Sequence, residues 1–261
     1  MMKPLFYKLA MPLSILAWVF ASVNANAATC ATSASSLYGW YAMLVSGTTG
    51  NVSAKYLVGA ILFDGVSQLT GNNVYGSGSD STVTGTYALN ADCTLTIQMN
   101  IGSTAQVYTV AMKTSNEAFG IEVDSSAVAT IDLQAQYATY TPGLNFTNSS
   151  ANGLFTGVCY GAAGATSDVN IASFSNGSVS GTDPYNNGGS GGSLQVANNP
   201  YTGTYTVNSD GTFSGTVSVD GYSFAFYGVI ANGGTELEYF YTDVASGTLP
   251  GAAFEGCVDK L

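Results

Sequence analysis

The stretch of sequence that decides the fold is residues 202–216, which read Thr-Gly-Thr-Tyr-Thr-Val-Asn-Ser-Asp-Gly-Thr-Phe-Ser-Gly-Thr. Residues 84–96 read Thr-Gly-Thr-Tyr-Ala-Leu-Asn-Ala-Asp-Cys-Thr-Leu-Thr, and seven positions of the two stretches are identical in register. Each stretch places threonine, tyrosine and aliphatic residues, which favour strands, on both sides of a polar Asn-x-Asp turn. Two copies of one β-hairpin predict an internal duplication of a β-unit.

Strict alternation of apolar and polar residues supports this prediction along residues 94–101. Leu95, Ile97, Met99 and Ile101 share one face, and polar residues occupy the other, which is the pattern of a half-buried strand. A Gly- and Asn-rich stretch at residues 72–81 predicts a loop. Alternation and strand-forming residues predict strands in the first half at residues 37–45, 56–64, 82–90, 94–101, 107–112, 118–123 and 129–137. In the second half they predict strands at residues 153–160, 168–174, 178–182, 203–208, 212–219, 222–230, 237–242 and 252–257.

These strands predict an all-β fold, a tandem duplication of two antiparallel units of about seven or eight strands each, built as barrels or as sandwiches. Residues 28–138 form the first predicted unit and residues 152–261 the second, with a linker at residues 139–151. So many strands with one apolar face require either closure of the sheet or packing of one sheet on another.

Residues 1–27 have the form of a secretory signal peptide. Lys3 and Lys8 provide the positive charge, residues 9–20 the apolar core, and Ala25-Asn26-Ala27 a cleavage site of small residues. The apolar run is shorter than a membrane-spanning helix requires. We therefore expect bacterial export to the periplasm, the cell surface or the medium, without a transmembrane helix.

Four cysteines remain after this peptide: Cys30, Cys93, Cys159 and Cys257. An even number of cysteines in an exported protein indicates two disulfides. Because two cysteines fall in each unit, we expect the pairs Cys30–Cys93 and Cys159–Cys257. Free thiols and a metal site are the alternatives, and the wide spacing and lack of histidine disfavour the metal site.

The composition excludes several classes of function. Charged residues make up 8% of the 261 residues, the formal net charge is −11, and arginine and histidine are absent. A histidine-dependent nucleophile and a bidentate arginine clamp are therefore excluded. An acidic chain is also a poor partner for nucleic acid and for anionic lipid. We expect a protein that is not an enzyme and that needs no cofactor or metal.

Paired carboxylates are the remaining candidates for catalysis. Glu236 and Glu238 alternate with Leu237, so both side chains lie on one side of a predicted strand. Such a pair could serve a carboxylate-based glycosidase or bind Ca²⁺. The favoured interpretation is a solvated outer face that keeps the strand soluble.

Aromatic residues are more numerous than two small cores need, with seventeen Tyr and twelve Phe. Some of them could line a cavity or form a platform for carbohydrate. Cross-strand packing of aromatic rings is the competing interpretation and the favoured one. The candidate ligand-binding residues are Tyr38, Trp40, Tyr41, Tyr56, Tyr87, Tyr108, Tyr205, Phe224 and Phe226.

Short motifs in both units resemble a group of known sequences. Gly39-Trp40-Tyr41, then Asp64-Gly65 with Leu69-Thr70-Gly71, and then residues 84–94 are similar to the Gly-x-Tyr and Thr-Gly-Thr-Tyr-x-x-Asn-x-Asp-Cys-Thr repeats of exported, uncharacterised bacterial proteins. The resemblance implies small lipocalin-like barrels and carries over no catalytic residue. The second unit departs from it at Gly211, where the first has Cys93.

Four functional hypotheses follow. The preferred one is a secreted, non-catalytic structural, adhesive or binding module of the cell envelope or extracellular matrix. The second is a lipocalin-like carrier that holds a small apolar ligand inside a barrel. The third is an outer-membrane barrel, and the fourth is the glycosidase. The partners expected are a small apolar ligand, a carbohydrate or another copy of the chain.

Overall fold

The computed structural model describes residues 33–49, 53–76, 80–124, 127–137, 145–161, 166–187, 197–219, 221–243 and 255–261. Most of this part of the chain is β-strand, and its helical elements are three short 3₁₀ turns: η1 (Ala34–Leu37), η2 (Asn148–Ala151) and η3 (Asn232–Gly234). None of the described helices has the length and apolar character needed to cross a membrane. The predicted signal peptide, Cys30 and part of the predicted linker lie outside the described residues.

The first eight strands close into an antiparallel barrel, in which each strand pairs with its neighbour in sequence and β8 returns to β1. Closure gives the inward side chains one shared interior and removes free strand edges. The strands are β1 (Gly39–Thr49), β2 (Ser53–Phe63), β3 (Gln68–Gly76), β4 (Asp80–Leu89), β5 (Thr94–Ile101), β6 (Thr104–Met112), β7 (Glu117–Glu122) and β8 (Ala127–Ala135).

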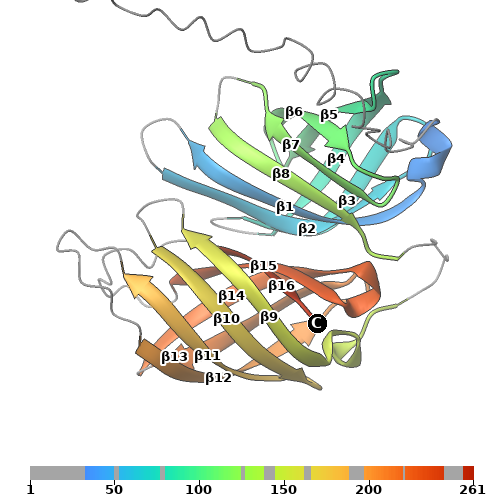
Figure 1. The fold of residues 1–261 in the computed structure, drawn as a ribbon. Coiled ribbons are helices and arrows are strands. Elements are labelled where there is room, and N and C mark those ends of the chain that lie inside the picture. The colour runs from blue at the N-terminus through green and yellow to red at the C-terminus, as the bar shows by residue number, and fades with distance from the viewer. Residues whose placement is uncertain are drawn as a thin grey trace, which may run out of the picture.

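The remaining strands form a second closed antiparallel barrel with the same order, and β16 returns to β9. Figure 1 shows the two barrels stacked one above the other. Two tandem antiparallel β-units were predicted, and this fold class is confirmed, with barrels rather than sandwiches. The strands are β9 (Gly153–Gly161), β10 (Thr166–Ser175), β11 (Ser178–Asn187), β12 (Ala197–Val207), β13 (Thr212–Val219), β14 (Tyr222–Ala231), β15 (Glu236–Asp243) and β16 (Glu255–Lys260).

The turns of the two repeated hairpins, residues 90–94 and 208–212, make the same hydrogen bonds. In each turn the asparagine N–H donates to the threonine carbonyl oxygen at 2.8 Å. In each, the aspartate accepts the threonine hydroxyl at 2.6 Å. Cys93 and Gly211 share the left-handed position, with φ of 67° and 85°. The difference in sequence at this position therefore leaves the turn unchanged.

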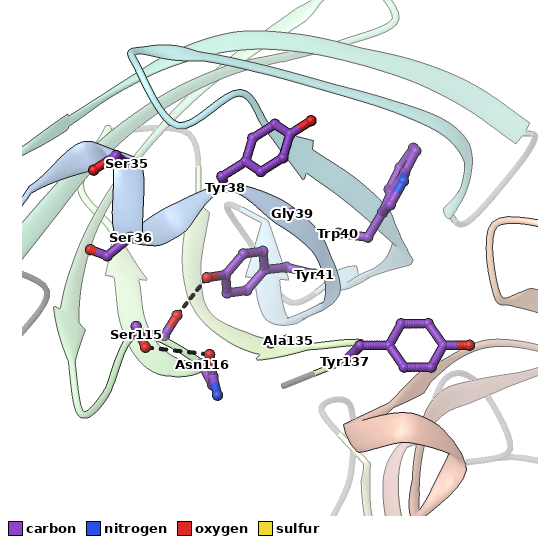
Figure 2. Close-up of a pocket in the computed structure, with 10 residues that line it drawn as sticks. All are labelled: Ser35, Ser36, Tyr38, Gly39, Trp40, Tyr41, Ser115, Asn116, Ala135 and Tyr137. Carbon is purple, nitrogen blue, oxygen red and sulfur yellow. Dashed lines mark hydrogen bonds between the residues drawn. The ribbon is translucent and has the colours of Figure 1, made fainter. Parts of the chain in front are cut away.

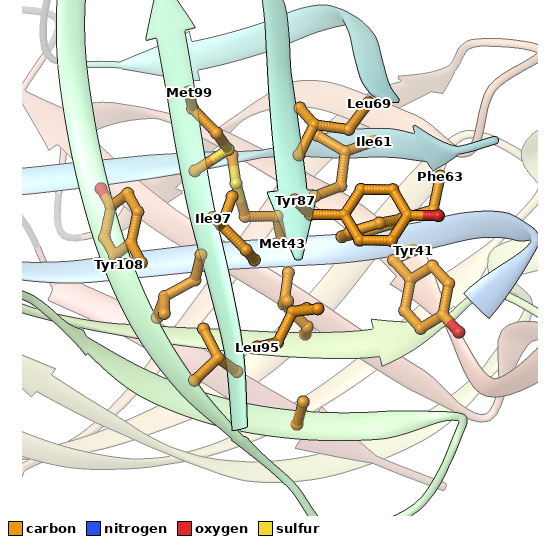
Figure 3. Close-up of a cluster of buried hydrophobic side chains, with 14 of the residues drawn as sticks. Tyr41, Met43, Ile61, Phe63, Leu69, Tyr87, Leu95, Ile97, Met99 and Tyr108 are labelled. Atoms are coloured by element: carbon orange, nitrogen blue, oxygen red, sulfur yellow. The ribbon is translucent and has the colours of Figure 1, made fainter. Parts of the chain in front are cut away.

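Apolar side chains pack the described interior of each barrel. Leu95, Ile97 and Met99 of β5 point inward and are at most 1% exposed, as their alternation predicted, and Figure 3 shows them meeting side chains of the other strands. The second interior is richer in aromatic rings, where Phe213 and Phe226 contact each other nearly edge-on with centroids 6.0 Å apart. Inward side chains of the described strands therefore pack against one another in both barrels.

A third buried cluster, which we name the joint, lies between the barrels. It consists of outward side chains of β1–β3 and of β14–β15, so the outer faces of the two barrels are packed against each other (Figure 1). The rings of Tyr56 and Phe240 stack across it with centroids 6.0 Å apart. At its edge, Asn73 donates to Asp210 at 2.9 Å. The joint comprises Ala42, Leu44, Tyr56, Val58, Ala60, Tyr75, Val229, Ala231 and Phe240, with Trp40 and Tyr227 partly buried against it.

The sequence prediction was wrong at β3, because residues 72–81 were expected to form a loop. Within this strand the register with β4 shifts between Gly71 and Val74, and Asn73 has a φ of 54°. This is a bulge, in which extra residues interrupt the pairing without ending the strand. Turn-forming residues inside a bulge are locally indistinguishable from a loop.

The described cysteines form disulfides. Cys93 and Cys159 are both disulfide-bonded, and no described cysteine is free. Strand register places Cys159 of β9 opposite Cys257 of β16, the arrangement expected for a bridge between the first and last strands. Because Cys30 and the side chain of Cys257 lie outside the described residues, the two pairings remain predictions.

Candidate ligand-binding site

A recess of about 280 Å³ lies at one end of the first barrel, where η1, the start of β1, the loop before β7 and the end of β8 meet. Aromatic rings and small polar side chains form its walls (Figure 2). None of the lining residues carries a charge, so the recess suits an uncharged ligand. The lining residues are Ser35, Ser36, Tyr38, Gly39, Trp40, Tyr41, Ser115, Asn116, Ala135 and Tyr137.

The local structure at η1 leaves the ring of Tyr38 exposed. Leu37, the last residue of η1, is buried in the first core, whereas the following residue, Tyr38, is 52% exposed. Gly65 lies behind Tyr38 with a φ of 76°, and a Cβ added there would lie 3.1 Å from the Tyr38 Cβ. Glycine is therefore the residue that fits this backbone conformation and this close approach.

Tyr41 is the buried ring of the recess. Its hydroxyl donates to the carbonyl oxygen of Ser115, which ties the loop before β7 to β1 (Figure 2). Burial raises the pKa of Tyr41 to about 12. Its ring meets Phe63 edge-on at 5.0 Å between centroids, and Phe63 meets Tyr87 in the same way at 4.8 Å. Tyr41 is thus held in place by packing on one side and a hydrogen bond on the other.

Neutral hydrogen-bonding groups surround the rings. The Ser36 hydroxyl donates to the Ser33 carbonyl oxygen at 2.5 Å, and the Ser115 hydroxyl donates to Asn116 Oδ1 at 3.3 Å. The Asn116 carbonyl oxygen accepts the Ala135 N–H at 2.7 Å, which fixes the loop backbone to the end of β8. Hydroxyl and amide groups on a fixed backbone can orient a hydroxyl-bearing ligand against the rings.

The remaining wall of the recess is shared with the joint. Trp40 is half-buried and packs against the joint on one side. The Gln136 N–H donates to the Trp40 carbonyl oxygen at 3.0 Å. The Tyr137 ring stacks on Phe146, part of the second core, with centroids 4.9 Å apart and planes 24° apart, and burial raises the pKa of Tyr137. The second barrel therefore helps to hold this wall.

The structure places most of the other predicted ligand-binding residues in cores. Tyr87 and Tyr108 are buried inside the first barrel. Tyr205 and Phe226 are buried inside the second barrel, and Phe224 packs against the same core. None of these five lines the recess, and Tyr56 belongs to the joint.

Tyr38, Trp40 and Tyr41 are the predicted residues that the structure brings together. Sequence reasoning missed Tyr137 and Asn116, which reach the recess from the segment just after β8 and from the loop before β7. Neither has a local signal, because only closure of the barrel brings β8 next to β1. A search for polar residues beside aromatic ones would not have separated them from many similar positions.

The interpretation of Glu236 and Glu238 as solvated residues is wrong, because they are 3% and 0% exposed. Glu236 lies 3.2 Å from Lys260 Nζ and accepts the Asn232 side-chain amide at 2.6 Å. Both carboxylates share the outward side of β15 with Phe240, which faces the joint. A glycosidase needs its two carboxyl groups on either side of an accessible bond, and burial denies that here. Within the described ranges, no group of three or more Cys, Asp or Glu is placed to hold a metal ion.

Comparison with known proteins does not assign this chain to a family. No protein-family model matches the sequence, and no curated protein matches it. Among solved structures, the chain is similar to HpuA from Kingella denitrificans in complex with human haemoglobin, with 10% identity, a TM-score of 0.34, and coverage of 83% of this chain and 90% of that chain. It is also similar to two mutants of the vaccine antigen transferrin-binding protein B from Haemophilus parasuis. One has 9% identity, a TM-score of 0.28 and coverage of 78% of this chain and 52% of that chain. The other has 8% identity, a TM-score of 0.25 and coverage of 84% and 74%. Similarities this low carry no argument about function.

Proposed function

We propose that this protein is an exported, non-catalytic binding module, and that the recess of the first barrel is its ligand site. The observation that carries the proposal is the charge-free recess of Tyr38, Trp40 and Tyr137 with serine and asparagine groups beside the rings. Binding sites combine aromatic walls with a few placed polar groups in this way. A composition with few charged residues and many Ser, Thr, Asn and Gly agrees with the cell-envelope or extracellular location predicted from the leader.

The ligand class that fits is a neutral carbohydrate, presented as a chain end or a short glycan. A sugar ring has an apolar face that packs on an aromatic ring and hydroxyl groups that bond to serine and amide groups. The volume of about 280 Å³ lies near the lower limit of ligand pockets, which is about 300 Å³. An adhesive role would follow from binding such glycans on a surface.

Two earlier alternatives receive less support from the geometry. A carrier of apolar ligands needs an open lumen, and buried apolar side chains pack against one another in the described interiors of both barrels. Outer-membrane barrels have a polar interior and an apolar outer band, whereas the described interiors are mainly apolar and aromatic, with the Lys55–Glu122 ion pair buried in the first. The recess lies at the end of the first barrel and is walled partly by Tyr41 and Ala135 of its core, and it is the site that we propose.

Calorimetric titration with a panel of neutral mono- and disaccharides tests the proposal. Tyr38→Ala should abolish the binding heat, because it removes the exposed ring without disturbing a core. Phe119→Ala is the matched control, since Phe119 is 59% exposed against 52% for Tyr38 and does not line the recess. Absence of binding by any sugar, or equal loss in both variants, would contradict the proposal.

A further inference from the structure

Glu238 has an environment that the proposed function does not use. Its side chain is fully buried on the outer face of β15, and neither carboxyl oxygen has a hydrogen-bond partner in the described part of the chain. In strand register it lies opposite Val229 of β14 and Val258 of β16. Burying an unpaired charge costs several kcal/mol, whereas a neutral acid leaves only unmade hydrogen bonds. The docked arrangement of the barrels is therefore compatible with the protonated acid.

Of the charged groups that act on Glu238, all but one raise its pKa. Asp132 on β8 of the first barrel and Glu236 on β15 both disfavour another negative charge. Burial, reinforced by these two carboxylates, holds the pKa of Glu238 well above its usual range. Lys260 of β16 opposes this effect, but it is 63% exposed and bonded to Glu236.

Asp132, on the first barrel, is partly buried and likewise lies close to other carboxylates. It lies opposite Leu44 of the joint in the β1–β8 register. Burial and the charges of Glu236 and Glu117 raise its pKa. Glu117 is itself paired with Lys113 at 2.7 Å on the surface. Carboxylates of both barrels thus interact across their contact, which makes the contact sensitive to proton loss.

The recess depends on the same contact between barrels. The Gly233 N–H of the second barrel donates to the Gln136 carbonyl oxygen at 2.6 Å, and Gln136 Nε2 donates to the Asp210 carbonyl oxygen at 2.8 Å. Gln136 is in turn bonded to the Trp40 backbone and precedes Tyr137. Separation of the barrels would therefore release the wall that carries both rings.

We propose that the joint acts as a pH-dependent latch. While Glu238 keeps its proton, the barrels remain docked, and Trp40 and Tyr137 remain in position at the recess. The latch rests on the proposed function only in treating the recess as the ligand site. An acid with a raised pKa in the docked state favours docking at low pH. This preference is lost as the pH rises from the ordinary carboxyl value through the raised one. Each unit of raised pKa weakens docking about tenfold at high pH.

Small-angle X-ray scattering of the full chain between about pH 4 and about pH 9 tests the latch. A Trp18→Phe background leaves Trp40 as the single tryptophan, so its emission reports the wall of the recess. The wild-type radius of gyration should increase and the Trp40 emission should shift to longer wavelength as the pH rises. Glu238→Gln should expand less than the wild type, because Asp132 is then the carboxylic acid with a raised pKa that is left to ionise at the contact.

Two further variants complete the design. Glu238→Met repeats the test without a titratable or amide group, in case glutamine disturbs the joint. Asp92→Asn removes one carboxylate from an exposed turn of the first barrel, keeps the turn acceptor, and should reproduce the wild-type pH profile. A wild-type profile that is flat, or that is unchanged by both substitutions at Glu238, would overturn the latch.

Sugar titration at both ends of this range separates the two proposals. If the latch is correct, sugar affinity falls with rising pH in the wild type and falls less in Glu238→Gln. If no sugar binds at any pH, the proposed function fails, while scattering still measures the joint. If sugars bind equally at all pH values and scattering is flat, the proposed function stands and the latch is rejected.

Discussion

Replacing Phe240 with alanine should uncouple the two barrels. The Phe240 side chain is fully buried, but it points out of the second barrel into the joint. Truncation of a buried phenylalanine costs about 3–5 kcal/mol. Its ring stacks on Tyr56 of the first barrel with centroids 6.0 Å apart, so we expect a loss within this range. That loss falls on docking, because neither barrel interior contains Phe240.

Scanning calorimetry distinguishes this effect from ordinary core damage. The wild type should unfold in one transition that includes both barrels, whereas Phe240→Ala should show two. Phe226→Ala is the matched control, because Phe226 is also buried, at 1% exposure, but points into the second interior from the adjacent strand β14. It should destabilise the second barrel itself. The same thermogram for both variants would refute the distinction between joint and core.

The remaining predictions concern the ion pair, the recess and the turn. Lys55 lies 2.6 Å from Glu122, both buried in the first barrel, so Lys55→Met should cost about 3–5 kcal/mol in urea unfolding. Adding Glu122→Leu should restore most of that stability, and a double variant no better than the single one would contradict this. Because burial raises the Tyr41 pKa from 10.0 to about 12, native stability should decline as the pH rises through that interval. Tyr41→Phe should flatten this decline in denaturant titrations, and an identical slope would count against it. Gly211→Ala should cost at least about 1 kcal/mol in thermal unfolding, because φ is 85° and a Cβ would lie 2.5 Å from Gln136 Nε2; full stability would exclude this geometry.

Local patterns predicted the strands well where alternation was clean. The predicted ranges 94–101 and 212–219 coincide with β5 and β13, because apolar residues at every second position have one way to reach a core. The prediction failed at β3, where a bulge imitates a loop. It also failed at Glu236 and Glu238, since a carboxylate on an outer face has the same sequence pattern whether water or another domain covers that face.

The candidate site was predicted only in part. Tyr38, Trp40 and Tyr41 lie within four consecutive residues, so an aromatic group at the start of β1 was visible without a structure. The hydrogen bond from Tyr41 to Ser115 joins residues 74 positions apart, and closure of β8 on β1 creates it. Other aromatic residues with the same local pattern turned out to be core residues.

An all-β chain and its hairpin turns could be predicted from the sequence, as could the lack of histidine- and arginine-dependent chemistry, because alternation, turn residues and residue inventory are local properties. The contact between the outer faces of two barrels, the burial of Glu238 between them, and the recess bordered by Trp40 and Tyr137 became visible only in three dimensions. These features arise where the outward faces of distant strands are buried against each other. The residue pattern of an outward face does not show which other face covers it.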